Sequence, residues 1–532
     1  MFLQGEARRD AKGLSDLIDY FAVAADGVVE TSTGIYLAAW EFAGRDMDAL
    51  PLEECFGIAD RLANVFSLGR GWSLQCDLIR EEYAEYIEDR CSWPDPMAEV
   101  VEEERRAWFT RTGVEGAPRL SRYFFCLSYE AREKGLRSVA KKLIGGKEES
   151  EESPDLALAR FQQKVREIDA ALRTNLRSVR RLKGYSRIGG GVRQHRDGLL
   201  EYIRLCVTGQ RFPFAVPQIP VDLNQYIAGD DFTGGAELQL GDPLNEILPG
   251  YFIRVLAVDS FPDVSFAGIL RAMDAVPLSF RFSQQAQILG DIEAADLFKE
   301  RKSNWKSKGQ GGIKAKLRSI DVHDLDDESL RLAADAREAA AKAEHGREIN
   351  CRYSGKVILM EQSIEGLRDT AQTITTRLRR CGFGSRIETV NAVGAWLGSF
   401  PGHQYKERRQ LVINTMNLAH MMPLSQPWRG HEFNPSKYFP PQSPPMFYAA
   451  TAGGAPYRFH CHVEDVGHPL VVGPTGAGKT SLVALGMMSA LRFKNAQVYA
   501  FDKKRSLYTL TRCAGGTFIE LSPESQEERL CP

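Results

Sequence analysis

The sequence has 532 residues, of which 43% are hydrophobic and 26% are charged, and its formal net charge is −2. This is the balance of an ordinary globular protein, with length for three or four domains at roughly 150 residues each. The near-neutral charge excludes a strong overall field that would draw the protein to nucleic acid or to anionic lipid, although a local patch can still do so.

The cysteines and the first residues bear on the cellular compartment. The ten cysteines are scattered and form no C-x-x-C pair, so we expect reduced thiols and no cysteine-based zinc site. The start of the sequence, MFLQGEARRDAKGL, lacks the apolar core of a signal peptide. No window of about 18 or more apolar residues occurs. We therefore expect no export signal and no membrane-spanning helix, in a protein that is cytosolic or held at a membrane by partners.

Strand and helix patterns alternate in the first 130 residues or so. Gly34–Phe42, residues 71–80 and Arg122–Glu130 have strand patterns, and Leu52–Gly69 has helical spacing that ends at a glycine. This alternation predicts an α/β or α+β domain.

Residues 140–200 are charged, and we expect them to be helical. The segment Leu176–Arg196 is basic. It is either a nucleic-acid patch or a solvated helix end with its loop, and the second interpretation is the simpler one. Further along the chain, Tyr251–Pro262 is predicted to be a strand closed by proline.

A second Lys-rich segment, Phe298–Ser319, contains one Trp and a glycine cluster. It could contact phosphates or lipid headgroups, but a mobile basic loop is the simpler interpretation. The Ala-rich segment Leu325–Gly346 is predicted to be a long helix whose acidic start suits the helix dipole. Residues 356–363 have a strand pattern and residues 364–383 a helical one, which restores the alternation.

Residues 423–456 are rich in proline, glycine and aromatic residues, and we interpret them as a connector. The predicted organisation is then an N-terminal α/β region with two segments, residues 1–200 and 201–422, the second carrying the basic loop and the long helices. The connector 423–456 follows, and residues 457–532 form a P-loop domain.

The segment Gly473–Thr480, GPTGAGKT, matches the pattern G-x-x-x-x-G-K-[ST]. A P-loop has to follow a buried strand and open a helix. Accordingly, HPLVVG at residues 468–473 is predicted to be a strand, Lys479–Phe493 a helix and Ala496–Asp502 a second strand. The context therefore agrees with the motif.

The residue types suit a bound nucleotide. Glycines allow the backbone N–H groups to approach phosphate oxygens closely, and the start of a helix adds a positive dipole end. Lys479 is the expected catalytic residue, reaching the β- and γ-phosphates, and Thr480 is the expected Mg²⁺ ligand. ATP and Mg²⁺ are the expected cofactors. The predicted nucleotide-binding residues are Gly473, Pro474, Thr475, Gly476, Ala477, Gly478, Lys479 and Thr480.

Other polar residues near the motif carry weaker signals. His460 and His462 are expected on one side of a strand, where two ligands do not make a zinc site. Asp502 ends the second predicted strand and either orients the nucleotide or caps local structure. No acidic residue follows a later apolar strand as a Walker B acid would.

Several stretches carry a resemblance to a known family. HVEDVGHPLVVGPTGAGKT, FDKKRS, TMNLAHMMPLSQPWRG, SPPMFYAATAGGAPYRF and VNAVGAWLGSFPG resemble the TrbE/CagE family of type IV secretion and conjugal transfer ATPases. This family is the fourth VirB component, and the resemblance is to its TrbE branch. It covers most of the chain, with the strongest motifs from about Asn391 onward.

The resemblance implies an N-terminal α/β docking domain followed by a RecA-like P-loop ATPase domain with a parallel sheet. It implies a homo-oligomer, a hexamer or a dimer, at the cytoplasmic face of the bacterial inner membrane. The implied partners are channel components of the inner membrane and other secretion ATPases, and the implied activity is ATP hydrolysis that energises pilus assembly and substrate transfer. The transferred substrate and any direct contact with nucleic acid stay open.

The sequence departs from the family pattern after the motif. Family members continue for a few hundred residues, which hold the Walker B acids and an arginine finger, whereas only 52 residues (532 − 480) follow Thr480 here. The expectation is a C-terminally truncated chain with an incomplete P-loop domain, whose hydrolysis on its own is in question. The alternatives are a non-catalytic scaffold that docks on the channel and a RecA-like DNA-pumping ATPase.

Overall fold

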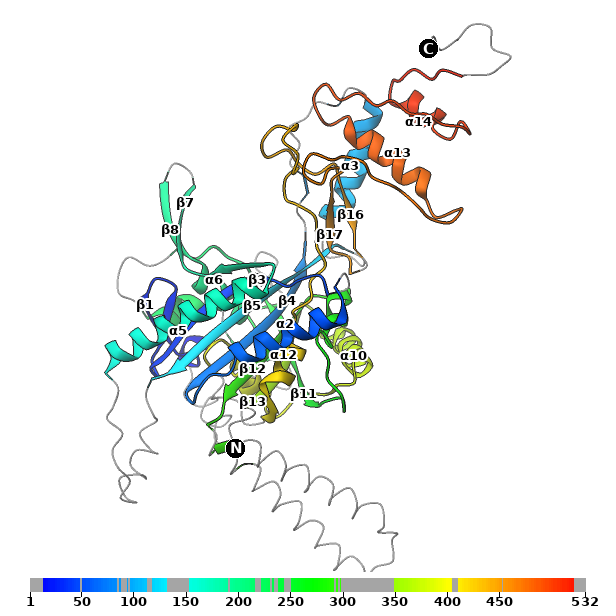
Figure 1. Cartoon of the computed structure of the whole chain (residues 1–532). Helices are drawn as coiled ribbons and strands as arrows, with labels where there is room; N and C mark the ends of the chain where they lie inside the picture. Colours follow the sequence, from blue (N-terminus) through cyan, green and yellow to red (C-terminus); the bar gives the residue numbers. More distant parts are fainter. Residues whose placement is uncertain are drawn as a thin grey trace, which may run out of the picture. The chain divides into compact units, whose positions relative to one another are not determined.

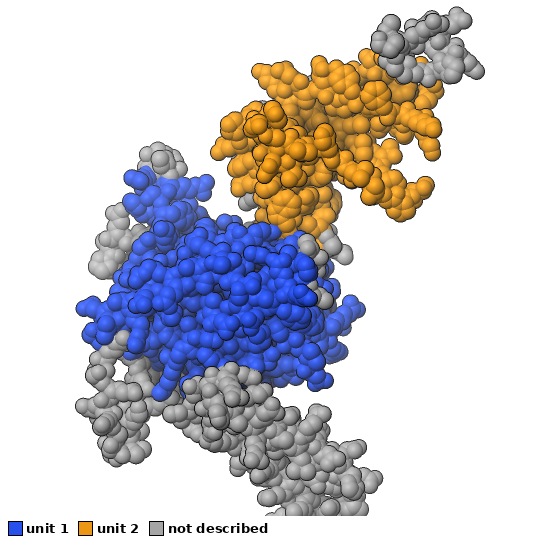
Figure 2. Space-filling view, viewed as in Figure 1, with its two compact units in different colours: residues 1–80, 121–426 blue, residues 81–120, 427–532 orange. Residues whose placement is uncertain are grey.

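The structure of the protein is a computed structural model. It describes residues 13–47, 50–83, 86–87, 93, 96–111, 117–131, 153–189, 192–215, 222–229, 232–233, 238–243, 250–290, 293–294, 297, 349–403, 410–451 and 453–520. The expected basic loop Phe298–Ser319 and the expected Ala-rich helix Leu325–Gly346 lie outside the described residues. Two compact units form, Met1–Arg80 with Ser121–Gln426 (unit 1) and Glu81–Leu120 with Pro427–Pro532 (unit 2) (Figure 2).

Unit 1 is built on a 13-stranded sheet (Figure 1). Antiparallel pairing joins β3 to β5, β12 to both β4 and β13, and β11 to β13. The strand order is β1 (Tyr20–Ala25), β2 (Val28–Thr31), β3 (Ile35–Ala43), β5 (Arg119–Glu130), β4 (Trp72–Glu82), β12 (Phe280–Ile288), β13 (Asn350–Glu361), β11 (Tyr251–Ser260), β10 (Leu238–Leu240) and β9 (Phe232–Thr233). Three short strands lie off this path: β6 (Ser178–Arg181) on β3, β14 (Gly384–Ile387) on β11 and β15 (Leu411–Asn414) on β13.

Helices cover both faces of this sheet. On the first face lie α2 (Leu52–Val65), α5 (Pro154–Asn175), α10 (Ile364–Arg380), α12 (Thr415–Met421) and the short η3 (Arg271–Ala275). On the second face lie η1 (Leu14–Asp16), α6 (Gly198–Thr208), α7 (Leu223–Ala228) and α11 (Ala392–Leu397). Because both faces are buried, strands such as β3 have apolar residues at nearly every position instead of alternating with polar ones.

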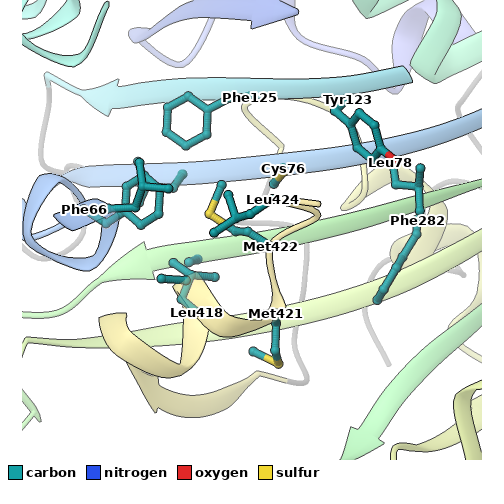
Figure 3. Packing of buried hydrophobic residues seen from close by; sticks show 14 of the residues in the cluster. Phe66, Cys76, Leu78, Tyr123, Phe125, Phe282, Leu418, Met421, Met422 and Leu424 are labelled. Atoms are coloured by element: carbon teal, nitrogen blue, oxygen red, sulfur yellow. The ribbon is translucent and has the colours of Figure 1, made fainter. Parts of the chain in front are cut away.

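The first face has an aromatic and aliphatic core. Figure 3 shows Leu418 and Met421 of α12, with Met422 just beyond it, packed toward the ring of Phe66 and the strand residue Phe282. These side chains are nearly inaccessible to solvent, and burial of each contributes about 1.5–3 kcal/mol to folding. The segment that follows α12 is therefore held to the sheet by apolar contacts.

The second face contains a buried ionic network at its centre. Asp77 of β4 is fully buried, and its carboxylate accepts hydrogen bonds from Gln75 Nε2 at 2.9 Å and from the Tyr202 hydroxyl of α6. Burial raises the pKa of Tyr202 well above its usual value, so this hydroxyl stays protonated and donates. Arg281 of β12 lies 3.5 Å from Asp77 and donates to the Ser399 carbonyl at 3.0 Å. The network thus ties two strands to α6 and to the turn after α11.

The expected helical character of residues 140–200 is only partly correct. Helix α5 ends at Asn175, and the basic segment after it forms β6 and then an antiparallel hairpin of β7 (Gly184–Gly189) and β8 (Val192–Asp197). The expected helix end and loop is therefore wrong for Leu176–Arg196. The chain between β6 and β7 is fixed to the sheet because Leu182 is buried and its amide donates to the Ala39 carbonyl at 2.8 Å.

Unit 2 contains α3 (Pro96–Thr110), β16 (Phe447–Ala450), β17 (Pro456–Phe459), α13 (Lys479–Ala490) and α14 (Tyr508–Cys513). Its strands β16 and β17 form a two-stranded antiparallel sheet. The mixed α/β character of the chain is confirmed, but no parallel RecA-like sheet is present among the described residues of this unit. Among the residues that the structure describes, no helix is long and apolar enough to cross a bilayer.

We expect Arg281→Met to destabilise unit 1 by about 3–5 kcal/mol, because Asp77 would keep a buried charge without its cation. The matched control is Arg352→Met, because the Arg352–Glu293 pair is about one-third exposed and its loss should cost at most about 1 kcal/mol. Urea unfolding followed by circular dichroism measures both variants. Equal stability loss in the two variants would contradict a special role for the buried pair.

Candidate functional site

The loop Gly473–Gly478 leads directly into α13, which begins at Lys479 as the sequence predicts. Gly476 has φ 84° and Gly478 has φ 77°, both in the left-handed region that residues with a side chain rarely adopt. Gly478 is the N-cap, and no side chain caps the helix. The first N–H groups of α13 therefore have no partner within the helix and are available to an anion.

Lys479 folds back over the loop. Its Nζ donates a hydrogen bond to the Pro474 carbonyl at 2.6 Å. The Cβ position of Gly473 lies 3.7 Å from Lys479 Cδ, so the loop and the lysine stem are in van der Waals contact. Thr480 is in the first turn and is exposed. The loop residues Pro474, Thr475 and Ala477 are also exposed.

These residues fit a nucleotide phosphate chain. Two left-handed glycines, uncapped amides at a helix start, an ammonium group over the loop and a hydroxyl in the first turn are the groups that such a ligand uses. Lys479 would neutralise phosphate charge, and Thr480 would supply a hydroxyl oxygen to Mg²⁺. A hollow of about 390 Å³ in unit 2 lies elsewhere, between α3 and β16, with Trp108 and Tyr448 in its lining.

The strands expected on either side of α13 do not form. Residues 468–473 and 496–502 are outside any strand, which corrects the strand–loop–helix–strand prediction. Their apolar side chains face solvent, with Leu470 85% and Phe501 93% exposed. The reason is physical: among the described residues, no neighbouring strand pairs with either segment, and a strand needs such a ladder for its backbone groups.

Asp502 caps local structure. Its carboxylate accepts hydrogen bonds from the amides of Lys504 at 3.0 Å and Leu507 at 2.8 Å, just before α14. These hydrogen bonds lower the pKa of Asp502, with that from Leu507 the strongest cause. Of the two roles that the sequence left open, the structure therefore supports capping.

The two histidines also differ from expectation, because β17 ends before them at Phe459. His460 Nε2 donates to the His431 carbonyl at 3.0 Å, and burial lowers the pKa of His460. His462 instead packs its ring on Phe439, with the ring centroids 5.1 Å apart. The two side chains thus have separate partners.

The far end of α13 is held by a buried ion pair that sequence patterns do not reveal. Arg492, two residues beyond the helix, donates to Glu102 of α3 and to the Pro445 carbonyl at 3.4 Å. Both side chains of the pair are nearly inaccessible, and the guanidinium lies 5.6 Å from the centroid of the Trp93 ring. Glu102 belongs to the run EEERR, which in sequence is indistinguishable from a solvated helix face.

Two protein-family models match the chain. The model described as "Type IV secretion system ATPase VirB4/TrbE, N-terminal domain" matches residues 27–136. The model described as "CagE, TrbE, VirB family, component of type IV transporter system" matches residues 192–409. Both matches end before the loop at residues 473–480.

Curated relatives match more of the chain. It is 31% identical to "Conjugal transfer protein TrbE" of Rhizobium radiobacter, with 98% of this chain and 62% of the relative covered. It is 35% identical to the second of two polypeptides described as "Probable conjugal transfer protein TrbE" in Sinorhizobium fredii, with 70% of this chain and 55% of the relative covered. It is 23% identical to "Protein virB4" of Agrobacterium fabrum, with 68% and 44% covered. The chain thus spans less than two thirds of the length of each of these relatives.

We expect Arg492→Met to loosen the C-terminal half of α13, because Glu102 would remain buried without its cation, at a cost of about 3–5 kcal/mol. Hydrogen–deuterium exchange of peptides covering residues 484–493 should then become faster. Arg512→Met is the matched control, since Arg512 is exposed on α14. Unchanged exchange in Arg492→Met would show that the ion pair does not hold the helix.

Proposed function

The chain belongs to the VirB4/TrbE family of type IV secretion ATPases, as its resemblance to the TrbE branch predicts, and we propose that it is an ATP-binding motor component of a type IV secretion or conjugal transfer system. In its full-length form, such a component hydrolyses ATP to energise pilus assembly and substrate transfer. The proposal covers the activity and partners of the whole protein, of which this chain matches a portion.

The observation that carries this proposal is the geometry at the start of α13. Gly476 and Gly478 are in the left-handed region, and Lys479 opens the helix with its ammonium group over the loop. An anion at this position meets backbone amides, a helix dipole and a lysine together. We assign Gly473–Thr480 as the nucleotide site, with ATP and Mg²⁺ as its ligands.

We propose a division of labour along the chain. Residues 1–200 and 201–422 form the docking region, residues 423–456 connect it, and residues 457–532 belong to a RecA-like P-loop domain. The exposed side chains of Leu470 and Phe501 support this division, because a RecA-like domain would bury both segments as central strands. The covering polypeptide would then complete the site for hydrolysis.

We propose inner-membrane channel components and other secretion ATPases as partners, with the protein as a homo-oligomer at the cytoplasmic face of the bacterial inner membrane. The names of the matching families and relatives support the system to which these partners belong. The absence of a membrane-spanning helix among the described residues is compatible with attachment through partners.

A second candidate function is a docking scaffold without catalysis. The observation in its favour is that both family-model matches, residues 27–136 and 192–409, lie outside the loop that would bind nucleotide. A pull-down with inner-membrane channel components separates the two candidates. Docking that is lost with Lys479→Ala would count against the scaffold, and docking that survives this change would favour it.

We expect Lys479→Ala to lower the affinity for Mg·ATP by at least about tenfold, since the variant removes the cation that faces the phosphates. Binding of a fluorescent ATP analogue to the chain measures the affinity directly, and phosphate release by the full-length form measures hydrolysis. Thr480→Ala should weaken binding only when Mg²⁺ is present.

The control is Lys494→Ala, because Lys494 is an exposed lysine beyond the opposite end of α13. This variant loses the same charge and should bind Mg·ATP like the wild type. Nucleotide affinity that is equal in Lys479→Ala and Lys494→Ala would refute the assignment of the loop.

A further inference from the structure

The β7–β8 hairpin of unit 1 is the most strongly charged feature that the proposed function does not use. Figure 1 shows the hairpin extending away from the sheet, and its strands pair only with each other. From Lys183 to Arg196 the sequence contains five basic or titratable basic residues and no acidic residue. They are Lys183, Arg187, Arg193, His195 and Arg196.

The arginines lie on both faces of the ribbon. The register pairs Tyr185 with Arg196 and Arg187 with Gln194, and these residues share one face because alternate residues of a strand point to the same side. Ser186, His195 and Arg193 lie on the other face by the same alternation.

Carboxylates are found at the base of the hairpin and not along its length. Asp26 accepts a hydrogen bond from the Gly184 amide at 2.9 Å, and Glu201 accepts one from the Tyr185 hydroxyl at 2.7 Å. Asp197 caps α6 through the amides of Leu199 and Leu200. Arg187 and Arg193 are exposed, and within the described part of the chain no salt bridge joins either of them to a carboxylate.

The base of the hairpin is anchored rigidly. Leu182 before β7 is buried in the second-face core, and the Gly198 amide after β8 donates to the Lys183 carbonyl at 3.1 Å. The N-cap formed by Asp197 continues β8 directly into α6. A positively charged ribbon is therefore held in place by the sheet and not left as a loose tail, which lowers the entropy lost when it binds a ligand.

We propose that the β7–β8 hairpin is a docking arm for duplex DNA, bound through its phosphates without reading the base sequence. A two-stranded ribbon has the width to enter the major groove. Arginines on both faces would then meet the phosphates of both groove walls, and an arginine can pair bidentately with a phosphate. The overall net charge of −2 hides this arm because acidic residues elsewhere balance it.

A membrane surface fits the same hairpin less well. A flat layer of anionic headgroups can contact only one face of a ribbon at a time, so arginines on the second face would stay unused. Surface-binding segments also interleave basic residues with bulky apolar ones. Between the arginines of this hairpin stand mostly the polar residues Ser186, Gln194 and His195.

The test measures binding of the full chain to a fluorescent duplex of mixed sequence by anisotropy, over a range of NaCl concentrations and without nucleotide. The variant is Arg187→Gln with Arg193→Gln. The matched control is Arg379→Gln with Arg380→Gln, which removes the same charge from two exposed arginines at the end of α10. We expect the hairpin variant to reduce the slope of log K against log salt by about 2 and the affinity near 0.1 M salt by about tenfold to a hundredfold.

The control variant should keep both the slope and the affinity of the wild type. No binding of duplex by the wild type, or equal losses in the two variants, would overturn the proposal. Two further probes identify another ligand if the duplex is wrong. If the hairpin variant loses binding to phosphatidylglycerol vesicles or to single-stranded DNA but keeps its binding to duplex, the arm serves those ligands instead. Omitting nucleotide keeps the outcome independent of Lys479.

Discussion

The buried pair of Asp77 and Arg281 constrains how the large sheet is assembled. Asp77 and its neighbours Cys76 and Leu78 point to opposite faces of β4, with Cys76 and Leu78 in the core of the first face. A slip of one residue between β4 and β12 would turn the carboxylate into that apolar core and away from Arg281. The pair therefore fixes strand register as well as the position of α6 and of the turn at Ser399, because all of them share its hydrogen bonds.

A second constraint acts on the candidate site in unit 2. Helix α13 is anchored at its C-terminal end, where Met488 and Ser489 are buried and Arg492 pairs with Glu102 of α3. Its N-terminal half, which carries the loop, is exposed. Residues 81–120 and 427–532 thus form one unit although more than 300 residues separate them in the sequence. The helix that presents the loop is therefore supported by a segment from a distant region of the chain.

Charge is also distributed by the fold and not by composition. The protein has nearly equal numbers of acidic and basic residues, 70 and 68, yet the β7–β8 hairpin exposes only basic ones along its length. The nearby carboxylates are engaged at its base in hydrogen bonds to backbone amides and to Tyr185. Local pairing therefore decides which charges are free to act on a ligand.

The sequence by itself determined the family, the position of the Gly473–Thr480 loop, the start of α13 at Lys479 and most strands of unit 1. These features depend on local signals: glycines at fixed spacing, apolar periodicity and short family motifs. Tertiary structure decided the rest. Residues 468–473 and 496–502 have strand propensity, but a strand forms only where a neighbour completes its hydrogen bonds. Likewise, the basic segment after Asn175 became a hairpin, and Glu102 became a buried partner, through contacts with residues far away in the sequence, which no local pattern records.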